Sequence, residues 1–143
     1  MSKKELSNPR VTSIRRFTLP KSQIIRGKRN FQKLFSEGTL IKSSSVNLRF
    51  TSYLDPEMGF KIGFIAPKNI GNAVLRNRCK RLLREAFRLN QHALKDTIDS
   101  LNIGLHAVLI ARNSDLDFST VQPQVAALLD ELRTRLLQQK NLS

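Results

Sequence analysis

Three stretches of the chain have apolar residues at steps of three and four, the spacing of an amphipathic helix. The first covers about residues 28 to 37, where Phe31, Leu34 and Phe35 precede a helix stop at Gly38. The second begins after Asn72, a good N-cap, and continues in more polar form to about residue 100. The third covers about residues 119 to 139. The apolar stripes are Leu75, Cys79, Leu82, Leu83 and Ala86 in the second helix, and Val121, Val125, Leu128, Leu129, Leu132 and Leu136 in the third.

Three other stretches predict strands. SVNLRFTSY and FKIGFIA alternate between apolar and polar positions, and the turn residues of LDPEMG separate them, so together they predict a hairpin. GLHAVLIA, residues 104 to 111, is a short apolar run typical of a buried strand. Because a helix separates the last two strands, we expect them to be parallel neighbours joined by a crossover, for which the usual hand is right. This order of elements predicts a mixed α/β sandwich.

The length of 143 residues and the apolar fraction of 40% predict one domain with one core, over residues 28 to 139. Before it, residues 1 to 27 are strongly basic, with nine cations up to Arg29 against Glu5 alone, and Pro9 and Pro20 interrupt any long helix. This composition predicts a flexible N-terminal arm. Residues 140 to 143 are expected to form a short tail.

Charge narrows the function classes. The chain carries 25 Lys and Arg against 11 Asp and Glu, a net charge of +14, which favours a polyanionic partner. No stretch has the roughly 20 apolar residues that cross a bilayer, so we expect no membrane association and a cytoplasmic protein. A single Cys79 and two isolated histidines predict neither an internal disulfide nor a zinc site. No pairing of carboxylates or of Cys with His indicates a protein active site.

The segment GNAVLRNRCKRLLREAFR, residues 71 to 88, concentrates six cations with one acid. At about 100° per residue, Arg76, Lys80 and Arg84 lie along one side of the helix and Arg81 in the adjoining sector, away from the apolar stripe. Like charges at this spacing destabilise an isolated helix, so an external anion is expected to bind there. Guanidinium groups suit phosphate better than lipid, which makes nucleic acid the leading class.

The residues leave three function classes open. A ribosomal or other structural RNA-binding protein without a nuclease role has a similar charge excess and size. A DNA-binding regulator would need a helix with base-reading side chains and usually a dimer seam. The third class is a subunit of an RNA-based endonuclease, and it rests on a resemblance.

FKIGFIAPKNIGNAVLRNRCKRLLREAFR resembles the signature of the bacterial ribonuclease P protein subunit, whose hallmark is Arg-Asn-Arg, then Lys-Arg, then an Arg-Glu pair. NFQKLFSEG upstream and AVLIAR downstream extend the similarity to about residues 28 to 137. The resemblance implies an α+β fold of order αβββαβα, similar to the ribosomal protein S5 domain 2-like fold. Its mixed four-stranded sheet contains a left-handed β-α-β crossover, an exception to the handedness rule.

The resemblance also implies the function. In that family a large RNA hydrolyses the phosphodiester that joins the 5′ leader to precursor tRNA, with Mg²⁺ bound mainly by the RNA, and the protein assists it. The implied partners are the catalytic RNA and the 5′ leader, with no obligate protein partner. The chain is then a protein cofactor of a ribonucleoprotein hydrolase and contains no catalytic residue of its own.

Two surfaces follow as hypotheses. The first, the basic ridge, is expected to bind the catalytic RNA and consists of Lys68, Asn72, Arg76, Asn77, Arg78, Lys80, Arg81 and Arg84. The second, the leader cleft, is expected between the first helix and the open face of the sheet and consists of Phe31, Phe35, Asn47, Arg49, Lys61 and Ile65. Arg49 stands where the family often has an aromatic residue, and Asn69 replaces one of two lysines, so the preference for leader sequence stays open.

Each of these residues also has a purely structural interpretation. A charged helix face can simply be solvated, and an aromatic pair such as Phe31 and Phe35 is often part of a core. Cys79 lies in the apolar stripe and is expected to be a packed thiol. Asp115 and Asp117 precede the last helix and are expected to be turn and cap residues.

Overall fold

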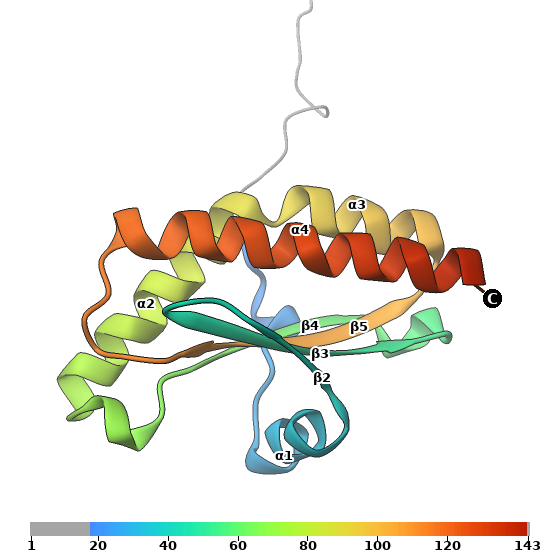
Figure 1. The fold of residues 1–143 in the computed structure, drawn as a ribbon. Coiled ribbons are helices and arrows are strands. Elements are labelled where there is room, and N and C mark those ends of the chain that lie inside the picture. Colours follow the sequence, from blue (N-terminus) through green and yellow to red (C-terminus); the bar gives the residue numbers. More distant parts are fainter. Residues whose placement is uncertain (1–17, 143) are drawn as a thin grey trace, which may run out of the picture.

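The computed structural model describes residues 18–142 as a four-stranded sheet with helices on both faces (Figure 1). The strands are β2 (Thr39–Lys42), β3 (Val46–Tyr53), β4 (Phe60–Ile65) and β5 (Gly104–Ala111). Helix α1 (Lys28–Glu37) lies on one face. The other face carries α2 (Ala73–Asn90), α3 (His92–Leu101) and α4 (Phe118–Leu142). Three short 3₁₀ turns are η2 (Lys21–Gln23), η3 (Pro56–Met58) and η4 (Lys68–Ile70).

The periodicity located most of these elements to within a residue or two, and the α+β class is confirmed. The helical stretch expected from residue 72 to about 100 consists of two helices, because the chain turns at Gln91. Strand β2 was not located from the pattern, since it is only four residues long. Helix α4 continues to Leu142 and so includes most of the segment expected to be a tail.

The predicted pairing of SVNLRFTSY with FKIGFIA is wrong. The sheet order is β2-β3-β5-β4, so β5 lies between the two strands that were expected to form a hairpin. Strand β3 pairs instead with β2 and with β5, both antiparallel. Alternation shows that a strand is half-buried but does not identify its neighbour, and here the buried strand β5 supplies a better partner for both β3 and β4. The expected parallel pairing of the last two strands, β4 and β5, is confirmed.

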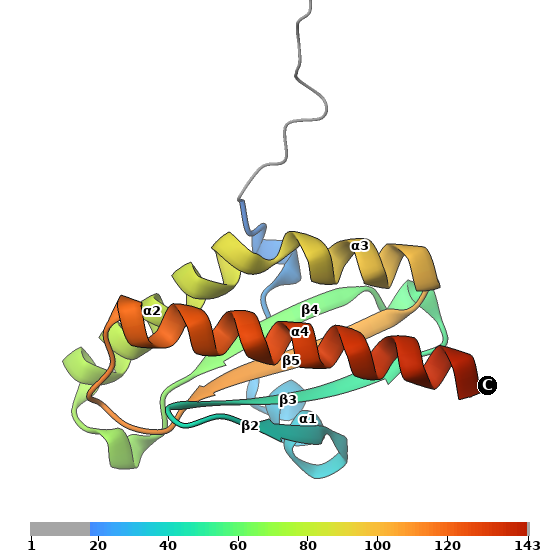
Figure 2. The ribbon, with the colours of Figure 1, turned by 45° about the horizontal axis from the view of Figure 1, so that its top comes forward.

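The crossover between β4 and β5 is left-handed. In Figure 2 both strands run from right to left, β5 lies below β4, and the connection through α2 and α3 passes in front of the sheet. The right-handed expectation from the general rule is therefore wrong, and the hand implied by the resemblance is the observed one. The apolar face of β4 gives a physical reason, because Ile62 and Phe64 need cover from the helices. A right-handed connection would place α2 against the face of Lys61 and Gly63.

The main core lies between the sheet and the layer of α2, α3 and α4. Its strand residues include Leu48, Ile62 and Leu109, which are fully buried, as expected from their alternation. The whole apolar stripe of α4 is buried with them, whereas in α2 only Cys79, Leu83 and Ala86 of the stripe are buried and Leu82 is half-buried. A smaller cluster on the opposite face joins α1 to the sheet through Leu34 and Val108. One core therefore holds the helices of one face in place and leaves the α1 face partly open.

Residues 18–27 pack against the domain, so the folded part begins before residue 28. Ile24 forms a parallel bridge with Ile62, and the amide of Ile25 donates to the carbonyl of Ile62 at 2.8 Å. The buried Gln91 donates from Nε2 to the carbonyl of Thr18 at 3.0 Å. This segment thus covers the outer edge of β4, an edge that would otherwise present unpaired backbone groups. The rest of the expected arm lies outside the described residues.

Candidate RNA interfaces

Helix α2 presents the basic ridge because its opposite side is held by the core. The side chain of Asn72 accepts a hydrogen bond from the amide of Leu75 at 3.0 Å and so caps the helix start, as expected. Cys79, Leu83 and Phe87 are fully buried against the sheet and α4. This fixes the rotation of the helix, and Lys80 and Arg81 consequently face solvent. One residue of the predicted stripe differs: Leu75 is 38% exposed because the first turn of α2 extends beyond the core.

Within the part of the chain that the structure describes, no acidic side chain forms an ion pair with a cation of the ridge. The acid of the ridge segment, Glu85, pairs with Arg88 at 2.6 Å, and the hydrogen bond from Arg88 holds the pKa of Glu85 below its ordinary value. Arg84 lies over the ring of Phe64 at 5.7 Å from the centroid, which positions its guanidinium without removing its charge. The ridge therefore keeps its positive charge for an external anion.

Two arginines of the ridge are also tied to the fold. Arg78 donates from Nη1 to the carbonyl of Leu116 at 2.6 Å, in the loop before α4. Arg76 is half-buried, and its Nε is buried without a hydrogen-bond partner among the described residues. The structure thus separates the ridge into freely exposed cations, such as Lys80 and Arg81, and arginines whose orientation the fold helps to set.

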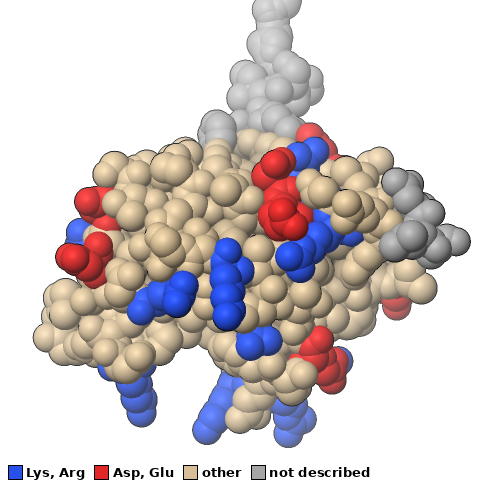
Figure 3. Space-filling view, in the orientation of Figure 1, with Lys and Arg blue, Asp and Glu red and all other residues tan. Residues whose placement is uncertain are grey.

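The remaining ridge residues lie at the start of α2. Lys68 is exposed on η4, and Asn77 is exposed one turn into the helix. Asn72 is exposed, but its side-chain oxygen is already used by the cap. Figure 3 shows Lys and Arg side chains projecting from the lower edge of the molecule, the side on which α1 lies in Figure 1, while acidic side chains lie along α4 and near its start. Figure 3 also shows basic side chains beside the acidic ones, so the two signs of charge are mixed on part of this face.

The second surface is organised by the way α1 crosses the sheet. Figure 1 shows this helix nearly end-on beneath strands that run across the view. Phe31 lies over Gly63, where a Cβ atom would come within 2.6 Å of its ring, and Phe35 lies near Arg49. Gly63 and Arg49 belong to one row of the sheet, since each pairs with Val108. The helix therefore follows this row and divides the open face of the sheet into two regions.

Five of the six residues of the predicted leader cleft lie on this row or on the side of it that leads toward α2. Phe35 is 41% exposed and lies under the guanidinium of Arg49, 5.8 Å from the ring centroid. Arg49 also donates to the carbonyl of Gly38 at 3.2 Å, which fixes its plane. Asn47 carries a buried Oδ1 without a partner among the described residues. Phe31 and Ile65 are half-buried and pack into the smaller core. For these two residues most of the side chain is therefore used in packing within the protein.

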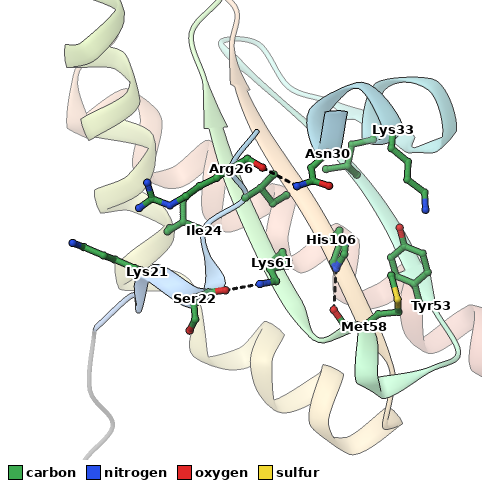
Figure 4. A pocket seen from close by; sticks show the side chains of 12 residues that line it. Lys21, Ser22, Ile24, Arg26, Asn30, Lys33, Tyr53, Met58, Lys61 and His106 are labelled. Carbon is green, nitrogen blue, oxygen red and sulfur yellow. Dashed lines mark hydrogen bonds between the residues drawn. The ribbon is translucent and has the colours of Figure 1, made fainter. Parts of the chain in front are cut away.

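Lys61 lies on the other side of α1. It stands four residues from Ile65 on the same face of β4, but Gly63 and the ring of Phe31 lie between them. Its Nζ donates to the carbonyl of Ser22 at 2.7 Å and lines a pocket of about 440 Å³ (Figure 4). The structure therefore does not bring Lys61 together with the rest of the predicted cleft. Alternation placed it on the correct face, but only the position of α1 decides the region to which it belongs.

We call this pocket the η2–α1 pocket. The sequence did not predict it as a site. Its cations are Lys21, Arg26, Lys33 and Lys61, its rings are Tyr53 and His106, its apolar wall is Ile24, Ile25, Leu34 and Met58, and Ser22 and Asn30 complete it. Tyr53 and His106 lie in an edge-to-face arrangement with centroids 4.9 Å apart. A signal was present, since Lys61 and His106 share a face of their strands, but the contribution of residues 21–26 could not be read from composition.

The remaining candidates are structural. Cys79 is fully buried, as expected, and burial raises the pKa of its thiol, an effect that the positive charge of Arg78 partly offsets. Asp117 caps α4 by accepting from the amide of Thr120 at 2.8 Å, which confirms its predicted role. In the part of the chain that the structure describes, no three His, Cys, Asp or Glu side chains gather as a metal site. No helix in the same part is both long and apolar enough to span a bilayer.

Comparison with known proteins shows the family to which this fold belongs. The family model described as Ribonuclease P matches residues 19–133. The ribonuclease P protein component of Desulfatibacillum aliphaticivorans is 34% identical over 122 residues, covering 84% of this chain and 92% of that protein. The component of Bacillus cereus strain G9842 is 41% identical over 97 residues, covering 66% and 75% of the two chains.

Two solved structures have the same fold. The RNase P protein of Thermotoga maritima superposes with a TM-score of 0.59 at 28% identity and covers 75% of this chain and 94% of that one. The RNase P protein of Staphylococcus aureus, solved at 2.0 Å, gives a TM-score of 0.62 at 22% identity, with coverage of 78% and 96%. The described domain thus corresponds to nearly the full length of both structures.

Proposed function

This chain belongs to the ribonuclease P protein family, and we infer from this that it is the protein subunit of ribonuclease P. In this role it assists a catalytic RNA in removing the 5′ leader from precursor tRNA. The holoenzyme is an endonuclease, and this chain is its protein cofactor. Its partners are accordingly the ribonuclease P RNA and precursor tRNA. We further infer that it works in the cytoplasm, a prediction that cell fractionation tests.

One observation carries the proposal that the basic ridge binds the catalytic RNA. The cations of this ridge form no ion pair within residues 18–139, and Lys80 and Arg81 are exposed to solvent on a helix whose rotation the core fixes. Because the helix that carries these cations is held in place by the core, binding to phosphates costs less backbone entropy than binding by a flexible segment would. Electrostatic binding of this kind is expected to weaken with salt.

We assign the leader to the region that Phe35, Arg49 and Asn47 line. The exposed ring of Phe35 and the half-buried guanidinium of Arg49 form a pair against which a base can stack, and Arg49 can also contact the backbone phosphate. Asn47 lies two residues before Arg49 on the same face of β3; its Oδ1 is buried, so a base amino group could reach this acceptor only after the side chain rotates. Phe31 contributes mainly by holding α1 on the sheet. Lys61 is left out of this assignment because α1 separates it from the other residues.

Hydrolysis is assigned to the RNA subunit, and Mg²⁺ is proposed to be held mainly there. Among the described residues, no three His, Cys, Asp or Glu side chains gather as a metal site, and the proposal gives this chain no metal-dependent step. The contribution of this chain is positional. The ridge would hold the protein on the RNA, and the leader cleft would keep the precursor in place while the RNA acts at the phosphodiester.

Reconstitution tests the function directly. The chain is combined with its cognate large RNA and a precursor tRNA at low Mg²⁺, and leader release is measured with and without the chain. We expect release to depend on the chain at low Mg²⁺ and a 5′ phosphate on the mature tRNA. If the chain changes neither the rate nor the affinity for precursor and instead co-sediments with ribosomal subunits, the assignment is wrong.

A further inference from the structure

The η2–α1 pocket has the chemistry of a binding site, although it lies apart from both surfaces described above. It is a pocket of about 440 Å³, which is within the roughly 300–1,000 Å³ range of small-ligand sites. Four of its lining residues are cations, and none of the lining residues is acidic. Two of its lining residues, Tyr53 and His106, carry aromatic rings. This combination suits a group that is both flat and anionic.

The walls of the pocket are held by specific contacts rather than by loose side chains. Lys61 donates to the carbonyl of Ser22, and Asn30 donates from Nδ2 to the carbonyl of Arg26 at 2.7 Å (Figure 4). These bonds tie η2 to β4 and the turn before α1 to the helix itself. The bridge between Ile24 and Ile62 anchors the same segment to the sheet. The segment that supplies half of the cations is thus part of the folded domain.

The rings are also fixed. Nε2 of His106 lies 3.0 Å from the carbonyl oxygen of Met58. Because a carbonyl oxygen can only accept a hydrogen bond, Nε2 carries a proton and donates it. In the neutral ring Nδ1 is then the acceptor. Tyr53 packs edge-to-face against His106, and Nζ of Lys33 lies 5.9 Å from the centroid of the Tyr53 ring. A cation beside an aromatic ring can bind a phosphate while a base stacks on the ring.

We propose that the η2–α1 pocket binds one unstacked nucleotide of RNA. The base lies against Tyr53 and His106, and Lys33, Lys61, Lys21 and Arg26 contact its phosphates. This proposal rests on the proposed function, because that function supplies the RNA. The nucleotide comes from one of two sources, the far end of a long leader that passes around α1 or an unpaired nucleotide of the catalytic RNA. The chemistry of recognition is the same for both.

Tyr53 is the single tyrosine of the chain, so it can report on this pocket alone. Protein labelled with 3-fluorotyrosine is titrated with uridine 5′-monophosphate and, separately, with inorganic phosphate at equal ionic strength, and the ¹⁹F resonance is followed. We expect a saturable shift with the nucleotide and a clearly smaller one with phosphate, which can contact the cations but cannot stack on the ring. Lys33→Gln should lower the affinity for the nucleotide by about fivefold, which is equivalent to about 1 kcal/mol of binding free energy. Lys28→Gln, which removes an exposed cation of α1 outside the pocket, is the matched control.

Three results of this titration would overturn the proposal: no saturable shift with the nucleotide, an equal shift with phosphate alone, or an equal loss in Lys33→Gln and Lys28→Gln. Phe35→Ala separates this pocket from the leader cleft. Because Phe35 does not line the pocket, its removal should leave the affinity measured at Tyr53 unchanged.

The holoenzyme identifies the source of the nucleotide. Tyr53→Leu and the control Tyr53→Phe, which keeps the ring, are reconstituted with the RNA and tested on precursors with a leader just long enough to fill the leader cleft and with a longer one. If the leader supplies the nucleotide, Tyr53→Leu weakens binding of the long-leader precursor alone, by about fivefold or more. If the catalytic RNA supplies it, Tyr53→Leu weakens the binding of the protein to the catalytic RNA by a similar factor when no precursor is present.

If neither affinity changes, the pocket does not bind RNA. The proposed function is judged separately, since leader release by the unsubstituted holoenzyme does not depend on this pocket. A holoenzyme that fails to release leader with the unsubstituted chain would contradict the proposed function, whereas normal release with an unresponsive Tyr53 contradicts only the inference about the pocket.

Discussion

The ring of Phe31 lies directly over Gly63, where a Cβ atom would approach Cε1 of the ring to 2.6 Å. This close approach seats α1 on the sheet along the row of Val108, and the division of the open face into the leader cleft and the η2–α1 pocket follows from it. A glycine in a strand interior weakens the strand, and here it makes room for another element.

Gly63→Ala is expected to destabilise the domain by about 1–3 kcal/mol, because the added methyl group overlaps the Phe31 ring and the backbone of β4 cannot easily move between β5 and residues 24–25. Urea unfolding measures the loss. Phe31→Leu combined with Gly63→Ala should recover part of it, since the smaller side chain leaves space for the methyl group. A double variant no more stable than the sum of the two losses would show that the two residues are not coupled.

Asn72→Ala should lower the free energy of unfolding by about 1 kcal/mol, because the amide of Leu75 loses its cap acceptor. Asn72→Ser is the control, since serine also caps well, and its stability should stay close to that of the unsubstituted chain. If Asn72 instead contributes mainly by binding RNA, both variants will be as stable as the unsubstituted chain, and the assembly of both with the RNA will weaken.

The double variant Lys80→Gln with Arg81→Gln should weaken assembly with the catalytic RNA and flatten its salt dependence. The expected decrease in the slope of log affinity against log salt is about 0.7–0.9 for each RNA phosphate that is no longer neutralised. Filter binding over a range of salt concentrations measures it. Arg135→Gln, a change on α4 away from the ridge, serves as the control and should leave the slope unchanged. Lys80 and Arg81 suit this test better than Arg78, because Arg78 also supports the loop at Leu116.

Phe35→Ala should weaken binding of leader-bearing precursor tRNA to the holoenzyme by about fivefold or more and leave binding of mature tRNA unchanged, because only the leader reaches the stacking platform. Equilibrium binding of the two tRNAs gives the comparison. Phe35→Tyr keeps the ring and is the matched control. An equal loss for both tRNAs would mean that Phe35 acts through assembly or stability and does not contact the leader.

Cys79 should react slowly with a thiol reagent in the folded protein. Its side chain is fully buried and its raised pKa keeps the thiol protonated at pH 8, so reaction requires unfolding. Because the unfolded chain loses the thiol proton at lower pH than the folded chain, the free energy of unfolding decreases as the pH rises above the ordinary pKa of 9.0 for this group. A colorimetric thiol assay with and without urea checks the first point. Rapid reaction without urea would contradict the burial.

The sequence by itself determined the local structure and the chemistry of the ridge. Helix α1 and strand β5 have the bounds that their patterns predict, and the cap at Asn72 and the outward direction of Lys80 and Arg81 follow from spacing within one helix. These features depend on neighbours a few residues apart, so periodicity alone fixes them. The family signature lies in the same segment, which is why the assignment to ribonuclease P could be made before the fold was known.

Only the tertiary structure decided which of these pieces meet. Alternation placed Lys61 and Ile65 on one face of β4, but the seating of Phe31 on Gly63 put them into different regions. The insertion of β5 beside β3 replaced the expected hairpin. Gln91 and Ile62, far away in the sequence, fixed residues 18–25 and so created the η2–α1 pocket. Each of these outcomes depends on contacts between distant residues, and the local pattern of polar and apolar positions carries no record of the partner that such a contact selects.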